Sequence, residues 1–162
     1  MSTISTGKVL LSLSSSWASV GSVVFDWNDT HIYNPEWPPH AKFHNAQTMS
    51  MAAALGAATL ATLWGRRGPL TSERLQVAAT TASLYWLTQL SAVAYPGTAL
   101  FDHPRTRKDQ AAAGGQAVEG GQAVEDAPPK VRGPQTVIAG LGLALNALGY
   151  GLERRRLARA GR

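Results

Sequence analysis

Four long segments built almost entirely from small and apolar residues constrain this chain more than any other feature. They lie within predicted helices at about residues 8–25, 40–65, 72–97 and 134–153. The apolar runs of the first, second and fourth, about residues 9–25, 46–64 and 135–152, show no polar face. Each is long enough to cross a bilayer as a helix. A soluble four-helix bundle is the alternative, but it would need a polar face on every helix. The pattern therefore predicts an all-α, integral membrane four-helix bundle that forms a single domain over residues 1–162.

The ends of these segments carry ordinary helix signals. The second segment stops at the sequence Gly-Arg-Arg-Gly-Pro of residues 65–69. The third begins near Thr71, a good capping residue, with Glu73 in the first turn, and Tyr-Pro-Gly at 95–97 closes it. Gly133 and Pro134 open the fourth. Because these signals are local, we expect four separate helices at these positions.

Between the third and fourth segments lies a low-complexity stretch. It contains the tandem repeat Gly-Gly-Gln-Ala-Val-Glu at residues 114–119 and 120–125. A tract of this composition cannot bury a core, so residues 105–132 are predicted to be a disordered loop. The same stretch explains why the mean hydropathy of the whole chain is only −0.10.

The distribution of basic residues predicts an orientation in the membrane. With both termini cytosolic, nine of the 15 Lys and Arg residues lie on the cytosolic side and six on the other. This is the sign that the positive-inside rule requires. We expect a multi-pass protein of the endoplasmic reticulum or another secretory membrane in a eukaryote, or of the plasma membrane in a bacterium. A cleaved signal peptide remains the alternative for residues 8–25, although Trp17 interrupts its small-residue site.

Composition also limits the chemistry and the partners. The chain has no cysteine, which excludes disulfides, thiolate metal sites and a cysteine nucleophile. Its net charge of +5 comes from basic residues placed directly after apolar segments, so membrane lipid is the expected partner and nucleic acid is not. Small residues at four-residue spacing, such as Gly140 and Ala144 or Ala147 and Gly151, predict close helix packing within one chain or in an oligomer.

A few polar residues interrupt the apolar segments. They are Gln47, Gln89 and Asn146. Hydrogen bonding between helices is one explanation, and lining of a ligand cavity is the other. Both alternatives place these side chains toward the interior of the bundle.

The reactive side chains concentrate between residues 26 and 44. This stretch holds three of the four histidines and two of the five tryptophans. A helix that starts at the prolines before His40 places His40 and His44 one turn apart on the same face. Asp26, Asp29 and His31 come from the preceding loop and can fold back over this face. Asp102 and His103 can reach it from the end of the third segment.

Three interpretations of this cluster remain open. A divalent metal could be held by His40, His44 and either His31 or His103. Proton transfer would instead pair a histidine with an aspartate. In a purely structural interpretation, Trp27, Tyr33 and Trp37 form an interfacial aromatic belt and the histidines satisfy backbone groups. For a ligand at this place, the predicted binding residues are Trp27, Asn34, Trp37, Gln47, Gln89 and Asn146.

The run from His31 to His44 reads H-x-x-N-P-x-W-P-P-H-A-K-F-H. It resembles the motif of an uncharacterised family of small, four-helix integral membrane proteins from filamentous fungi and some bacteria. The motif covers about a tenth of the chain. The resemblance implies that the histidines belong to a family pattern, with fungal secondary metabolism as a setting for some members, and it implies no particular catalytic residue.

These observations lead to one functional hypothesis with two alternatives. We expect a small membrane enzyme, an isomerase or cyclase, that acts on a lipophilic metabolite such as a terpenoid or polyketide. His40 and His44 would be acid and base, and Asp29 or Asp102 would orient one of them. A metal-dependent oxidase or hydroxylase that uses the same histidines is the second enzyme class. A non-catalytic binding or assembly protein is the third alternative.

Overall fold

Four long helices make up most of the chain that the structure, a computed structural model, describes: residues 4–65, 68–98, 100 and 133–161. They are α1 (Thr6–Asp26), α2 (Pro39–Leu60), α3 (Ser72–Ser91) and α5 (Pro134–Ala160). A short π-helical turn, η1 (Ala61–Gly65), continues α2, and a 3₁₀ turn, η2 (Ala92–Ala94), continues α3. The prediction of an all-α four-helix bundle is confirmed. The predicted disordered loop, residues 105–132, lies outside the described residues.

The helices begin where the local signals predict. Pro39 occupies the first turn of α2, and the side chain of Thr71 accepts a hydrogen bond from the backbone N–H of Arg74 at the start of α3. The last helix is longer than the apolar segment from which it was predicted, because α5 continues to Ala160 through the arginine-rich tail. Arginine is a good helix former, so the tail extends the helix without apolar residues.

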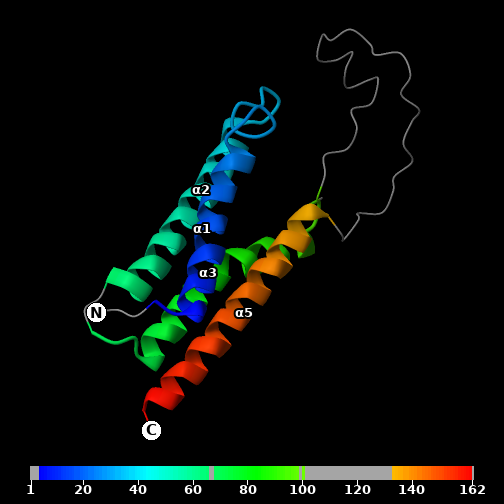
Figure 1. Cartoon of the computed structure of the whole chain (residues 1–162). Helices are drawn as coiled ribbons and strands as arrows, with labels where there is room; N and C mark the ends of the chain where they lie inside the picture. Colours follow the sequence, from blue (N-terminus) through cyan, green and yellow to red (C-terminus); the bar gives the residue numbers. More distant parts are fainter. Residues whose placement is uncertain (1–3, 66–67, 99, 101–132, 162) are drawn as a thin grey trace.

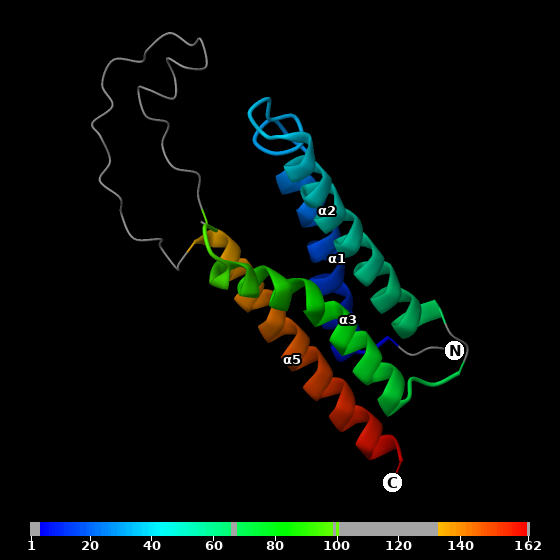
Figure 2. The same cartoon turned by 180° about the vertical axis from the view of Figure 1, so that it is seen from behind.

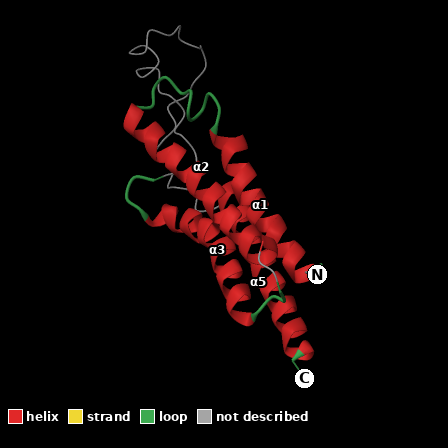
Figure 3. Cartoon of the chain, turned by 90° about the vertical axis from the view of Figure 1, so that its left-hand side faces the viewer, coloured by secondary structure: helices red, strands yellow, loops and turns green. Residues whose placement is uncertain are grey.

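α1 lies between two neighbours, with α2 on one side and α5 on the other (Figure 1). α3 packs on α5 and on the end of α2, as the view from behind shows (Figure 2). The first turn of α1 and the last turn of α5 lie at one end of the bundle, and the loop of residues 27–38 lies at the other (Figures 1 and 3). This topology brings the beginning and end of the chain together.

Glycines set the distance between α1 and its two neighbours. A Cβ atom on Gly7 would lie 2.5 Å from the carbonyl oxygen of Gly149 on α5. On the other side, a Cβ atom on Gly56 of α2 would collide with the Ser19 hydroxyl. These contacts let the backbones approach closely, as small residues do in membrane helix pairs.

The small residues predicted for close packing do not contact another helix of this chain. Gly140 and Gly151 face open space, and Ala144 and Ala147 are exposed, so their packing in an oligomer stays a prediction. Four-residue spacing selects a single face of a helix, but it does not say which face meets a neighbour. The contacting glycines of α5 are Gly142 and Gly149, which repeat after seven residues.

The bundle buries polar side chains and exposes apolar ones. The buried polar and charged residues are Lys8, Ser14, Ser15, Ser22, Thr59, Asn146 and Glu153. Large apolar side chains cover the outer faces of all four helices, among them Leu13, Trp17, Val20, Val24, Phe43, Met51, Val77, Leu87, Val137, Leu141 and Leu148. The apolar core is small and is made mainly of leucine and alanine with Trp86.

Of the described helices, α1 and α5 are long and apolar enough to cross a membrane. The sequence predicts four such spans, and length and composition of the described helices support two of them. α2 carries polar residues in its first half, and α3 carries Glu73 and Arg74 in its first turn with several threonines after them. These residues lower the hydropathy of both helices.

Candidate functional site

The loop of residues 27–38 is held in shape by asparagine side chains. Asn28 donates to the carbonyl of Phe25, and its side-chain oxygen accepts from the backbone N–H and the hydroxyl of Thr30. Asn34 donates to the carbonyl of Thr30 and accepts from the N–H of Glu36. Such side-chain to backbone bonds build tight turns. Asn34 was predicted to bind a ligand, but its side-chain amide forms hydrogen bonds within the loop.

A histidine and a carboxylate meet where this loop returns to the bundle. The Asp26 carboxylate, at the end of α1, lies 3.9 Å from Nε2 of His31, and Asn45 of α2 donates a 3.0 Å hydrogen bond to its other oxygen. Nδ1 of His31 lies 2.8 Å from the Thr30 hydroxyl, and the ring packs edge-on against Trp37. The two side chains of the pair are 34% and 21% exposed. We call Asp26, Thr30, His31 and Asn45 the Asp26–His31 site.

The hydrogen bonds of this site orient the His31 ring. The Thr30 hydroxyl donates its single proton to the Asn28 side chain, so it accepts from Nδ1–H of His31. Nε2 then faces the Asp26 carboxylate at 3.9 Å, which is beyond hydrogen-bond distance. The buried Oδ1 of Asn45 has no hydrogen-bond partner among the described residues. The arrangement places a carboxylate beside one ring nitrogen of His31.

His40 and His44 form a second, separate group on α2. Their Nε2 atoms are 3.1 Å apart, and Nδ1 of His44 lies 3.3 Å from Oε1 of Gln47. The Phe43 ring is stacked nearly parallel to that of His40. All of these side chains are exposed. We call His40, His44 and Gln47 the His40–His44 pair.

The structure does not bring all the predicted residues together. Among the described residues, no three His, Asp or Glu side chains form a group that could hold a metal ion. His31 is held by the Asp26–His31 site, whereas His40 and His44 point outward from α2. Asp29 is exposed, and no hydrogen bond or ion pair in the described part of the chain joins it to a histidine. Asp102 and His103 lie outside the described residues.

Trp27 bonds to Tyr33 within the loop. Its indole N–H donates a 2.6 Å hydrogen bond to the hydroxyl of Tyr33, and both rings are more than half exposed. The two aromatic rings thus cover the surface of the loop. The other predicted aromatic residue, Trp37, contacts His31 directly.

The polar residues inside the helices have different environments. Asn146 is buried, and its amide donates to the carbonyl of Ala82 and the hydroxyl of Ser83 on α3. This matches the explanation by interhelical hydrogen bonding. Gln89 is half-buried, and its side-chain oxygen has no hydrogen-bond partner among the described residues. Gln47 is exposed beside His44.

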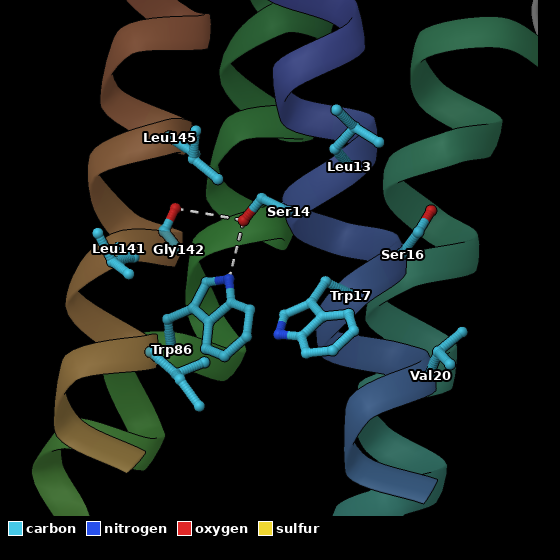
Figure 4. A pocket seen from close by; sticks show the side chains of 10 residues that line it. Leu13, Ser14, Ser16, Trp17, Val20, Trp86, Leu141, Gly142 and Leu145 are labelled. Carbon is cyan, nitrogen blue, oxygen red and sulfur yellow. Dashed lines mark hydrogen bonds between the residues drawn. The ribbon is translucent and has the colours of Figure 1, made fainter. Parts of the chain in front are cut away.

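A groove of about 520 Å³ lies between α1 and α5, with Trp86 of α3 at its floor (Figure 4). Its walls are formed by Leu13, Ser14, Ser16, Trp17, Val20, Trp86, Ile138, Leu141, Gly142 and Leu145. The indole N–H of Trp86 donates to the hydroxyl of Ser14, which donates to the carbonyl of Gly142. None of the predicted ligand-binding residues lines this groove. The residues that form its walls belong to no recognisable motif, so the sequence did not indicate it.

Buried charges occupy the opposite end of the bundle. Glu153 is fully buried and accepts from the Ser5 hydroxyl at 2.5 Å and from the guanidinium of Arg156. Lys8 is 1% exposed, with its ammonium 3.6 Å from the centre of the Trp64 ring. These contacts join α1 to α5 and to the π-helical turn after α2. Lys8 is one of the nine basic residues predicted to lie on the cytosolic side, and Glu153 has no predicted role.

Comparison with known proteins gives one finding. No curated protein and no solved structure matches the chain significantly. A family profile matches residues 10–114, which include most of α1, all of α2 and α3, and the whole loop with both histidine groups. By this match the chain belongs to a family of unknown function, DUF6640.

Proposed function

We propose that this protein is a small multi-pass membrane enzyme that acts on a lipophilic molecule, such as a terpenoid or polyketide, by proton transfer. The observation that supports a membrane location is the reversed polarity of the bundle. Large apolar side chains lie on the outer faces of all four helices, while seven polar or charged side chains of the described residues are buried inside. An exterior with so many large apolar side chains favours lipid over water as its surroundings.

The orientation in this proposal places both termini in the cytosol and the loop of residues 27–38 on the other side. The arginine-rich end of α5 supports it through the positive-inside rule. Since the chain has no cysteine, single cysteines can report the topology. Asp29→Cys should react with a membrane-impermeant maleimide from the non-cytosolic side only, and Gly161→Cys from the cytosolic side only. Equal labelling of both from one side would contradict the orientation.

The catalytic part of the proposal rests on the Asp26–His31 site. A protonated His31 ring would act as the general acid, and the Asp26 carboxylate would stabilise its positive charge. Isomerisation needs one proton delivered to the substrate and one removed, and the neutral ring left after delivery can remove it. His31 is favoured over His40 and His44 because an aspartate lies beside it. An isomerase or cyclase is the reaction type that this chemistry supports.

Deuterium exchange tests this proposal without a known substrate. The purified protein is incubated in D₂O with a lipid extract of its source cells, and carbon-bound deuterium is measured by mass spectrometry. The wild type should label at least one lipid. His31→Gln should lower the rate by about 10² to 10⁴, the usual contribution of general acid–base catalysis. Asp29→Asn, which alters an exposed aspartate outside the site, is the matched control and should leave the rate unchanged.

Other outcomes would contradict the proposal in distinct ways. Addition of oxygen to a lipid, without deuterium, would favour the metal-dependent oxidase or hydroxylase. The same labelling in His31→Gln as in the wild type would remove His31 from the chemistry. Folded protein that leaves every lipid unlabelled would favour a binding or assembly function.

A further inference from the structure

We propose that the His40–His44 pair is a binding site for a single divalent ion of a late transition metal, with Gln47 as its positioning residue. The site lies on the exposed side of α2 and uses neither Asp26 nor His31. It is therefore independent of the proposed proton transfer.

The distance between the two rings fits one shared ion. Two nitrogen ligands bonded at about 2.1 Å to the same ion lie roughly 3.0 to 3.4 Å apart, depending on whether the geometry is octahedral or tetrahedral. The Nε2 atoms of His40 and His44 are 3.1 Å apart. An ion can therefore replace the hydrogen bond between them without a change in the distance between the two nitrogens, once the rings turn toward it. The spacing of one helical turn fixes both rings on a rigid element.

Gln47 selects the tautomer that metal binding requires. Its Oε1 lies 3.3 Å from Nδ1 of His44, and an amide oxygen can only accept, so Nδ1 of His44 carries the proton. The lone pair of that ring is then on Nε2, which faces His40. Metal-binding histidines commonly donate their other N–H to such an acceptor, which fixes the ring and raises its basicity.

Exposure of the pair leaves the remaining coordination positions free for water. Imidazole nitrogens suit zinc, copper and nickel, and among divalent ions Cu²⁺ binds such sites most tightly. The neighbouring Phe43 ring, which is stacked on His40 and edge-on to His44, shields one side of the pair. The expected complex is one ion per chain with two protein nitrogens.

Copper titration of the full-length protein, purified in detergent and with any affinity tag removed, tests the site. Electron paramagnetic resonance should show one Cu²⁺ per chain with coupling to two imidazole nitrogens, and calorimetry should show Zn²⁺ binding at the same stoichiometry. His44→Ala should lose the second nitrogen coupling and weaken binding at least tenfold. Gln47→Ala should weaken it about tenfold while keeping both nitrogens, as expected for an outer partner of a ligand.

His31→Ala is the matched control, since it removes a histidine of the same loop region without touching the pair. It should leave the copper signal and the affinity unchanged. The proposal is overturned if the wild type binds no stoichiometric ion, if His44→Ala binds as tightly as the wild type, or if His31→Ala removes the site. Circular dichroism verifies folding of each variant, and the exposure of His40 and His44 makes these substitutions easy to tolerate.

Discussion

The indole N–H of Trp86 on α3 donates a 2.9 Å hydrogen bond to the hydroxyl of Ser14 on α1, and both side chains are almost completely buried. Because the Ser14 hydroxyl also donates a hydrogen bond to the carbonyl of Gly142 on α5, this one hydroxyl connects α1, α3 and α5.

Replacement of Ser14 by alanine should destabilise the protein. The buried indole N–H would lose its acceptor, and an unpaired buried donor costs about 1–3 kcal/mol. Denaturant or thermal unfolding in detergent measures the effect. Ser16→Ala, a change of the same size on the same helix at a half-buried serine, should have a much smaller effect. Equal stability of the two variants would show that the Ser14 hydrogen bond contributes nothing.

Gly142→Ala should also destabilise the bundle, for a steric reason. A Cβ atom at this position would lie 2.5 to 2.7 Å from atoms of the Trp86 indole ring. Overpacking of this kind costs about 1–3 kcal/mol. Gly140→Ala is the control two residues away, because its Cβ atom would meet open space and alanine favours the helix. If Gly142→Ala is as stable as Gly140→Ala, α3 and α5 are not packed as described.

Loss of the Glu153 carboxylate should also destabilise the protein. In Glu153→Ala the Ser5 hydroxyl loses its acceptor, and Arg156, whose side chain is 39% exposed, loses its ion-pair partner. Because water can hydrate the exposed guanidinium, the cost should stay below about 3–5 kcal/mol, the cost of breaking a fully buried ion pair. Glu153→Gln keeps a hydrogen-bond acceptor for Ser5 and should lose less, whereas Arg154→Ala on the exposed side should be nearly neutral. The melting temperature should be highest for Arg154→Ala, intermediate for Glu153→Gln and lowest for Glu153→Ala.

Asn146→Ala distinguishes the two explanations given for the polar residues inside the helices. Its amide donates to Ala82 and Ser83, so the loss should cost about 1–3 kcal/mol in unfolding experiments. Gln47→Ala, at an exposed position, should leave stability unchanged. A normal melting temperature for Asn146→Ala would instead favour a ligand-lining role for this side chain.

The helices could be predicted from the sequence because their signals are local. The cap at Thr71, the proline at the start of α2 and the long uncharged segments act within a few residues of where they stand. The partners of Asp26 could not be predicted in the same way. Asn45 follows His44 directly, but a rotation of about 100° per residue turns its side chain to another face of α2. Only the packing of α2 on α1 shows that this face meets the carboxylate.

The same reasoning explains why the buried serine and glutamate were overlooked. Ser14 is one of several serines in α1, and only the approach of α3 and α5 distinguishes it from Ser22, which bonds to the carbonyl of Ser19 in its own helix. Glu153 stands next to a row of arginines and resembles part of a solvated tail. Its burial follows from the absence of a side chain at Gly7, which lets α1 approach α5 closely.

The pairing of the first helix with the last has a consequence for biosynthesis. The groups of α1 that are satisfied by α5, the hydroxyls of Ser5 and Ser14 among them, leave the ribosome long before their partners do. The earlier part of the chain, α1 to α3, therefore keeps these positions unpaired until α5 has been synthesised. Docking of α5 completes the four-helix bundle, and a separately synthesised α5 should be able to complete a chain that lacks it.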